Sequence, residues 1–211
     1  MHIKDQEFFH IHRIGEWSTR WNVNSIIYWG QKEINNFNRF YDMNGLITNL
    51  TNGNGNMYGR SALQNFLLQP QSFQEVNYNN MLKIALQIVK EQSIYIRETI
   101  FEEVRMNYFP QLPSRKTCIW VCEKESIPYW WNIIGGQKKI FKLQLTGVLH
   151  KADQKYLIND TLPHNEIRAH AFNYWTGADG SNSIEEELLF EGIIKIIDEY
   201  QDINNFNVRM K

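Results

Sequence analysis

A pair of histidines and a pair of carboxylates are the residues whose types and spacing could do chemistry. His10 and His12 would share one face of a strand, where they could bind a metal or simply pack at a sheet end; no third ligand is evident nearby. Glu185 and Glu187 would share a face of a later strand, with Glu186 on the other. Two carboxylates on one face repel, which raises the pKa of one of them, unless the run is solvated.

A basic loop and an aromatic group are two further candidates. Ser114, Arg115 and Lys116 place a hydroxyl and two cations just before a strand, where they could hold phosphate groups or form an ordinary basic turn. The aromatic residues are expected mostly in the core, although an exposed member could stack on a base or a nicotinamide ring. They are Trp120, Tyr129, Trp130, Trp131 and Trp175.

Strands and helices must position these residues. Alternating residue types predict a strand over 6–13, and apolar residues three and four apart predict a helix over 78–107, ended by Pro110. Glu98, Glu102 and Arg105 are expected on the solvated face of that helix. Further strands are predicted over 117–123, 139–145 and 186–197, with a short helix over 126–134 and a helix between an N-cap at Thr161 and Gly177.

The order of elements predicts an α+β fold with a mostly antiparallel sheet, in a single domain over 1–211. Residues 31–80 are expected to be an irregular insertion, because they contain the turn dipeptides Asn44-Gly45, Asn52-Gly53 and Asn54-Gly55. Residues 201–211 are expected to be a frayed polar tail. Neither a dinucleotide-binding glycine motif nor a P-loop is present in the sequence.

Length and composition exclude several classes of protein. The 211 residues carry 22 Lys+Arg against 23 Asp+Glu, which argues against a bulk polycation for nucleic acid or a polybasic membrane anchor. No apolar run approaches the roughly 18 residues of a membrane span. Charges interrupt the N-terminal segment, so no signal peptide is expected, and Cys118 and Cys122 are expected to be packed thiols in a reducing cytoplasm.

Short motifs resemble those of ADP-ribosyltransferases, and they occur in the same order along the chain. Phe8-Phe9-His10 is similar to the aromatic–His motif of that family's first strand, often Y-H-G-T. Residues 118–132, CIWVCEKESIPYWWN, resemble the next motif, a strand such as hIYIT followed by a short helix. In this alignment Trp120 falls on the family's Tyr.

The later motifs extend the resemblance over about 180 residues. Residues 139–147, KIFKLQLTG, resemble the RIFVVEPTG strand of rifampin ADP-ribosyltransferases. Glu185-x-Glu187-Leu188-Leu189 is similar to the E-x-E-[VI]-L motif that ends the active site. The chain also resembles a bacterial family of unknown function with the pattern LPSR-x-x-C-I-W-V-C-E, then Y-W-W and a late E-E-E-[LI]-L-F-E-G.

The resemblance implies a split antiparallel sheet with a long helix and short helices, and a catalytic set of Glu187, Glu185 and His10. Glu187 would hold the ribose 2′-hydroxyl of NAD and stabilise an oxocarbenium-like centre as nicotinamide leaves. Glu185 would serve as base for the acceptor, and His10 would bind the ribose hydroxyls. No metal would be required.

The implied NAD-binding set consists of His10, Arg13, Ser114, Arg115 and Trp120. The arginines are candidates for the pyrophosphate, and the Trp120 ring would stack against the nicotinamide. We therefore expect His10, Trp120 and Glu187 to converge on one cleft, with Arg115 near its mouth.

The function that follows is an NAD-dependent mono-ADP-ribosyltransferase acting in the cytoplasm on a macromolecule, RNA or protein. Such a protein could be a toxin of a toxin–antitoxin or anti-phage system, with an antitoxin protein as partner. Residues 101–155 hold nine Lys+Arg against five Asp+Glu, a basic stretch suited to phosphates or to solvent.

Two alternatives stay open. Trp120 and the missing Thr after His10 favour a non-catalytic NAD- or nucleotide-binding module on the same fold. A nuclease or phosphotransfer enzyme would instead use His10, His12 and Arg115.

Overall fold

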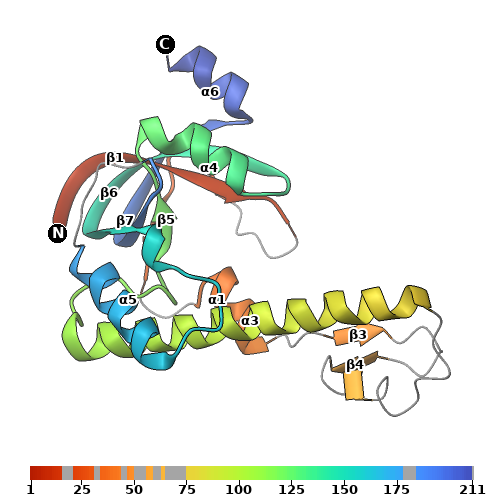
Figure 1. Cartoon of the computed structure of the whole chain (residues 1–211). Helices are drawn as coiled ribbons and strands as arrows, with labels where there is room; N and C mark the ends of the chain where they lie inside the picture. The colour runs from red at the N-terminus through yellow and green to blue at the C-terminus, as the bar shows by residue number, and fades with distance from the viewer. Residues whose placement is uncertain are drawn as a thin grey trace.

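The computed structural model (Figure 1) describes residues 1–15, 21–30, 34–43, 47–49, 56–58, 63–64, 75–177 and 184–210. The Asn-Gly dipeptides at 44–45, 52–53 and 54–55 lie outside the described residues. Mixed helices and one large antiparallel sheet confirm the α+β class. None of the helices in these ranges is both long and apolar enough to span a bilayer.

The main sheet has the order β1-β6-β7-β2, with β5 paired to β7 beside that path. Every pairing in it is antiparallel. The two long strands β6 and β7 form the centre of the sheet, and the shorter strands pair along their edges. The strands are β1 (His2–Arg13), β2 (Ile26–Trp29), β5 (Ile119–Val121), β6 (Lys138–Asp153) and β7 (Glu186–Tyr200).

The sheet curls until β5 meets β1. Phe9 and Cys122 exchange two backbone hydrogen bonds, with N···O distances of 2.9 and 2.8 Å. The strands β1, β6, β7 and β5 thereby close into a small ring, which leaves fewer unpaired strand edges. The inner face of this ring is apolar, and its buried members include Phe8, Leu145 and Phe190.

Helices cover the outer face in two groups (Figure 1). The long helix α3 (Glu75–Tyr108) and α5 (His164–Thr176) pack over one end, around Phe101 and Trp175. The short helices α4 (Ile127–Ile133) and α6 (Ile203–Arg209) cover the other end, around Phe9 and Phe206.

Most sequence predictions of elements are confirmed, and α3 extends the predicted helix by three residues at its start. Several predictions are wrong at the ends of elements, since β1 begins at His2 rather than at residue 6 and β5 covers only Ile119–Val121. The strand predicted over 139–145 continues to Asp153, and α5 begins at His164 with Pro163, not Thr161, as its N-cap. The tail is helical in α6, because the Asp202 carboxylate caps the Asn205 N–H at 2.7 Å and Phe206 is buried.

The region 31–80 is less irregular than expected. Its described parts contain helix α1 (Asn36–Met43) and a hairpin of β3 (Ile47–Asn49) and β4 (Asn56–Tyr58). The first turns of α3 also fall within it.

Paired glycines let β6 and β7 approach closely at one point of their ladder. Gly147 lies opposite Gly192. At Gly192, φ is +144°, and an added Cβ would lie 2.5 Å from the Thr146 carbonyl oxygen and 2.8 Å from the Gly147 Cα. Both contacts are with backbone, which cannot move aside without disturbing the ladder.

We predict that Gly192→Ala lowers the free energy of unfolding by about 2–4 kcal/mol, because it adds a backbone clash to an unfavourable φ. Urea unfolding followed by circular dichroism measures the change. The control is Gly135→Ala, where a Cβ meets nothing within 4 Å. Equal stability of the two variants would show that the close approach is not required.

Candidate functional site

A buried arginine between two carboxylates forms the polar centre of the molecule. Arg115 is 3% exposed, and its Nε donates to Glu98 Oε2 at 2.8 Å. Its Nη1 donates to the Tyr174 hydroxyl at 2.6 Å and to Glu187 Oε2. These four side chains come from α3, the loop before β5, α5 and β7, so the network joins distant parts of the chain.

The loop that presents Arg115 is held from α1. The Asn35 and Asn38 side-chain amides donate to the Arg115 carbonyl at 2.7 and 3.1 Å. Asn35 also caps Asn38 through an N–H···O contact of 3.0 Å. Both asparagines are buried, so they occupy backbone acceptors that would otherwise be unpaired.

Glu191 holds the same loop from β7. Its Oε1 accepts from the Ser114 N–H at 3.0 Å and from the Thr117 hydroxyl at 2.6 Å. Burial raises the pKa of Glu191, although these two donors act against the shift. Ser114 therefore supports the loop through its N–H, and its hydroxyl accepts from the Lys116 N–H at 3.1 Å.

The charges in this network compensate one another. Arg97 joins through an ion pair with Glu98 at 2.6 Å, so two cations face the carboxylates of Glu98 and Glu187. Burial by itself would raise the pKa of Glu98, but the Arg115 and Arg97 guanidiniums outweigh it and hold that pKa below its ordinary value. Glu98 is therefore ionised at neutral pH and buried only because it is paired.

Glu187 is fixed at one oxygen. Oε2 accepts from both Arg115 and the Tyr174 hydroxyl, the latter at 2.8 Å. Burial raises the pKa of Tyr174 well above its ordinary value despite the nearby arginine, so the hydroxyl keeps the proton that it donates. Within the described part of the chain no hydrogen bond is recorded on Oε1, and the side chain is 12% exposed.

Trp120 lies on the same face of the sheet as Glu187. Trp120 pairs with Leu189, two residues from Glu187, so alternation points both side chains outward. The Arg115 Cζ lies 5.8 Å from the centre of the Trp120 ring system. The structure therefore brings together three of the predicted residues, Glu187, Trp120 and Arg115.

His10 lies on the inner face instead, so the expected convergence of His10 with Glu187 is wrong. His10 pairs with Phe141, and its ring packs against Trp21 with centroids 4.9 Å apart. Its neighbour Phe9 is the residue that faces outward with Cys122. His10 reaches β5 only through the backbone, by a contact of 2.8 Å with the Trp120 carbonyl.

Both nitrogens of His10 are engaged. A carbonyl can only accept, so Nδ1 carries the hydrogen bonded to Trp120, and Nε2 accepts from His12 Nδ1 at 3.4 Å. Burial, followed by the charge of His12, lowers the pKa of His10 to about 3, against the opposing effect of the carbonyl. With Arg115 buried on the other face, these residues do not gather as a nuclease site would require.

Arg115 does not lie where it was predicted, and Arg13 and Glu185 lie apart from the network. Arg115 itself is buried rather than at a cleft mouth, because its donors are committed to the two carboxylates. Arg13 is exposed at the end of β1, opposite Lys138. Glu185 is exposed in the turn before β7, and its charge contributes, after burial, to a raised pKa of Tyr129.

Sequence reasoning missed Glu98 and Tyr174. Glu98 was expected on a solvated helix face but is 3% exposed, whereas the expected Glu102–Arg105 pair is confirmed at 2.7 Å. No local pattern distinguishes Glu98 from a solvated charge on a helix, because its partner Arg115 lies 17 residues further along the chain. Among the residues described, no three His, Cys, Asp or Glu side chains gather as metal ligands.

Comparison with protein families matches residues 8–205 to the model described as "Protein of unknown function (DUF2441)". The chain belongs to this family. The match spans β1 to α6, so it includes Arg115, its three partners Glu98, Tyr174 and Glu187, and Arg97, which pairs with Glu98. It agrees with the expected membership of a family of unknown function, and it carries no activity with it. A comparison with curated proteins finds no match.

We predict that Arg115→Met lowers the free energy of unfolding by about 3–5 kcal/mol, because it leaves Glu98 buried without its main partner. Chemical unfolding measures the loss. The matched control is Arg168→Met, which removes a half-exposed pair with Glu103 at 3.4 Å and should cost less than about 1 kcal/mol. A loss for Arg115→Met no larger than for the control would contradict a central role of this ion pair.

Stability should fall as the pH drops below about 6.5. The pKa of His10 is about 3 in the folded protein and about 6.5 in the unfolded chain. As the pH falls below 6.5, the unfolded chain therefore binds a proton that the folded protein does not, and the free energy of unfolding decreases. His10→Asn keeps an N–H donor but cannot titrate, so its stability should change less between pH 7 and pH 5, by on the order of 1–2 kcal/mol. Parallel pH profiles for the two proteins would contradict the neutral buried histidine.

Proposed function

We propose that this protein is an NAD-dependent ADP-ribosyltransferase in which Glu187 is the catalytic carboxylate. The observation that supports it is the anchoring of Glu187 at a single oxygen, by Arg115 and Tyr174, on the face of the sheet that also carries Trp120. A carboxylate held in one orientation can stabilise developing positive charge without reorganising. The choice of NAD as substrate rests on the order of the sequence motifs.

The chemistry assigns a role to each oxygen of Glu187. Oε2 is occupied by its two donors, which makes Arg115 and Tyr174 positioning residues. Oε1 is the atom that would accept the ribose 2′-hydroxyl. As the bond between C1′ and the nicotinamide nitrogen breaks, its electrons leave with neutral nicotinamide, and the carboxylate stabilises the positive charge on the sugar.

The transfer step completes the reaction. The acceptor's nucleophilic atom forms a new bond to C1′ and loses a proton, for which the exposed Glu185 is the proposed base. The proposed acceptor is a cytoplasmic macromolecule, RNA or protein, as for a toxin with a neutralising partner. Trp120 keeps its proposed stacking role, and His10 is removed from the proposed site because it lies on the inner face.

A second candidate is a binding module without catalysis on the same fold. Two observations favour it: His10 and Glu187 lie on opposite faces of the sheet, and Arg115 neutralises Glu187. The guanidinium compensates part of the negative charge that Glu187 would otherwise offer to a cationic sugar.

We predict that the purified protein releases nicotinamide from NAD⁺ and that Glu187→Gln lowers the rate at least about 100-fold, because the amide cannot stabilise the cationic sugar. Chromatography of nicotinamide measures the rate, with cell lysate supplied as the source of acceptor. The matched control is Glu166→Gln, an exposed carboxylate in the first turn of α5, which should leave the rate unchanged.

Glu187→Asp provides a second test if the amide disturbs folding, since it keeps the charge but withdraws it by one methylene. Thermal melting of each variant separates lost catalysis from lost structure. If wild-type protein binds NAD⁺ and releases no nicotinamide with lysate present, the binding module replaces the transferase.

A further inference from the structure

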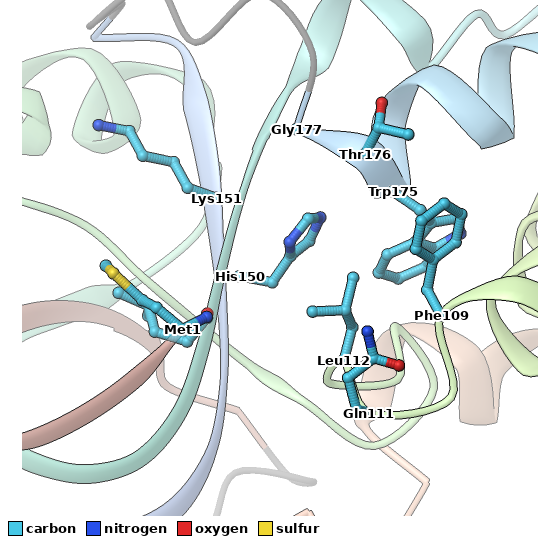
Figure 2. Close-up of a pocket in the computed structure, with 10 residues that line it drawn as sticks. Met1, Phe109, Gln111, Leu112, His150, Lys151, Trp175, Thr176 and Gly177 are labelled. Carbon is cyan, nitrogen blue, oxygen red and sulfur yellow. The ribbon is translucent and has the colours of Figure 1, made fainter.

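A cavity of about 460 Å³ opens on the outer face beside α5, and Figure 2 shows its lining. This volume lies within the range of small-molecule sites, about 300–1,000 Å³. Its walls come from β6, the loop after α3 and the end of α5. Phe109, Leu112 and Trp175 give the cavity apolar walls, and Gln111 and His150 add polar groups.

His150 is the buried polar group of this cavity, at 7% exposure. Its ring lies against Trp175 with centroids 5.3 Å apart and 29° between the planes. Figure 2 shows the imidazole projecting from β6 toward the end of α5. A histidine held in this way presents a fixed edge to any molecule in the cavity.

The hydrogen bond of His150 to the Tyr174 carbonyl determines which ring nitrogen is left to contact a ligand. Nε2 lies 3.2 Å from the Tyr174 carbonyl, which can only accept, so Nε2 carries the hydrogen. Nδ1 is then an acceptor, and no partner for it is recorded in the described part of the chain. Burial lowers the pKa of His150 to about 4, so the ring stays neutral at pH 7.

Two cations lie near His150, and each already has a partner. Lys151 forms an ion pair with Glu186 at 2.7 Å, and Figure 2 shows its side chain directed away from the imidazole. The Met1 ammonium, which also lines the cavity, donates to the Leu149 carbonyl at 2.6 Å. A ligand with a carboxylate would therefore meet the lone pair of Nδ1 while both cations are held by other groups. The cavity favours a neutral ligand that donates a hydrogen bond.

We propose that this cavity binds a small planar heteroaromatic group carrying an N–H donor, which the His150 Nδ1 accepts while the apolar walls contact its faces. An aromatic carboxamide and an adenine base share this chemistry. Glu187 does not line the cavity, so the site is separate from the proposed catalytic carboxylate and does not depend on transferase activity.

Isothermal titration of the full chain with nicotinamide, nicotinate and adenosine tests the proposal. Nicotinamide or adenosine should bind, and comparing the two titrations shows whether the cavity takes an aromatic carboxamide or an adenine base. Nicotinate, which lacks the donor, should bind at least about tenfold more weakly than nicotinamide. These affinities are expected whether or not the protein releases nicotinamide from NAD⁺, so the outcome for this site is separate from the outcome for the proposed transferase activity.

Two substitutions locate the site. Thr176→Trp places a bulky ring at the exposed rim and should weaken binding about tenfold or more, whereas Asn173→Trp, also exposed on α5 but outside the lining, should leave it unchanged. His150→Phe keeps the ring and removes the acceptor, with a similar expected loss. Absence of binding by both donor probes, equal binding of nicotinate, or equal effects of the two tryptophan variants would overturn the proposal.

Discussion

The burial of one guanidinium between two carboxylates is the constraint on which the rest of this structure depends. Removing Arg115, Glu98 and Glu187 from water is costly for each ion, and only their mutual contacts offset the cost. Because the partners come from α3 and β7, their geometry requires that the long helix pack on the sheet in one register. Tyr174 extends the same requirement to α5.

This constraint also explains the supporting contacts around the loop before β5. A buried ion pair requires that the main chain on which it depends be fixed in position. Asn35, Asn38 and Glu191 fix the loop around Arg115 by hydrogen bonds from opposite sides. The orientation of the Glu187 carboxylate is fixed for the same reason, since its two donors, Arg115 and Tyr174, are themselves held by packing and burial. Structural and proposed catalytic roles thus fall on one set of side chains.

Much of the fold could be predicted from sequence because its signals are local. The apolar spacing in α3 and the alternation in β1 specify their type, and Pro110 marks where the helix ends. Element ends were harder to predict. The predicted strand stops at residue 145, yet β6 continues through His150 and Lys151, because His150 is buried against Trp175 and Lys151 is paired with Glu186.

The site was predictable only in part, for a geometric reason. Alternation shows which residues of one strand share a face, but it does not relate that face to another strand. Trp120 and Glu187 lie on one face because β5 pairs directly with β7, whereas the pairing of β1 turns His10 inward. Glu98 was hidden for another reason: a charge on a helix resembles a solvated one until its partner, 17 residues away, is known.

The closed ring of strands has a consequence for how the chain folds. β1 finds its ladder partner only at β6, and both β2 and β5 pair with β7, which ends at Tyr200. During synthesis, β1 therefore stays without its ladder partner until β6 has emerged, and β2 and β5 stay without theirs until β7 has emerged, close to the end of the residues described. Such non-local pairing slows folding and lengthens the time in which the unpaired strand edges can associate with other chains. The protein should accordingly depend more on chaperones during synthesis than a protein of its size built from local contacts.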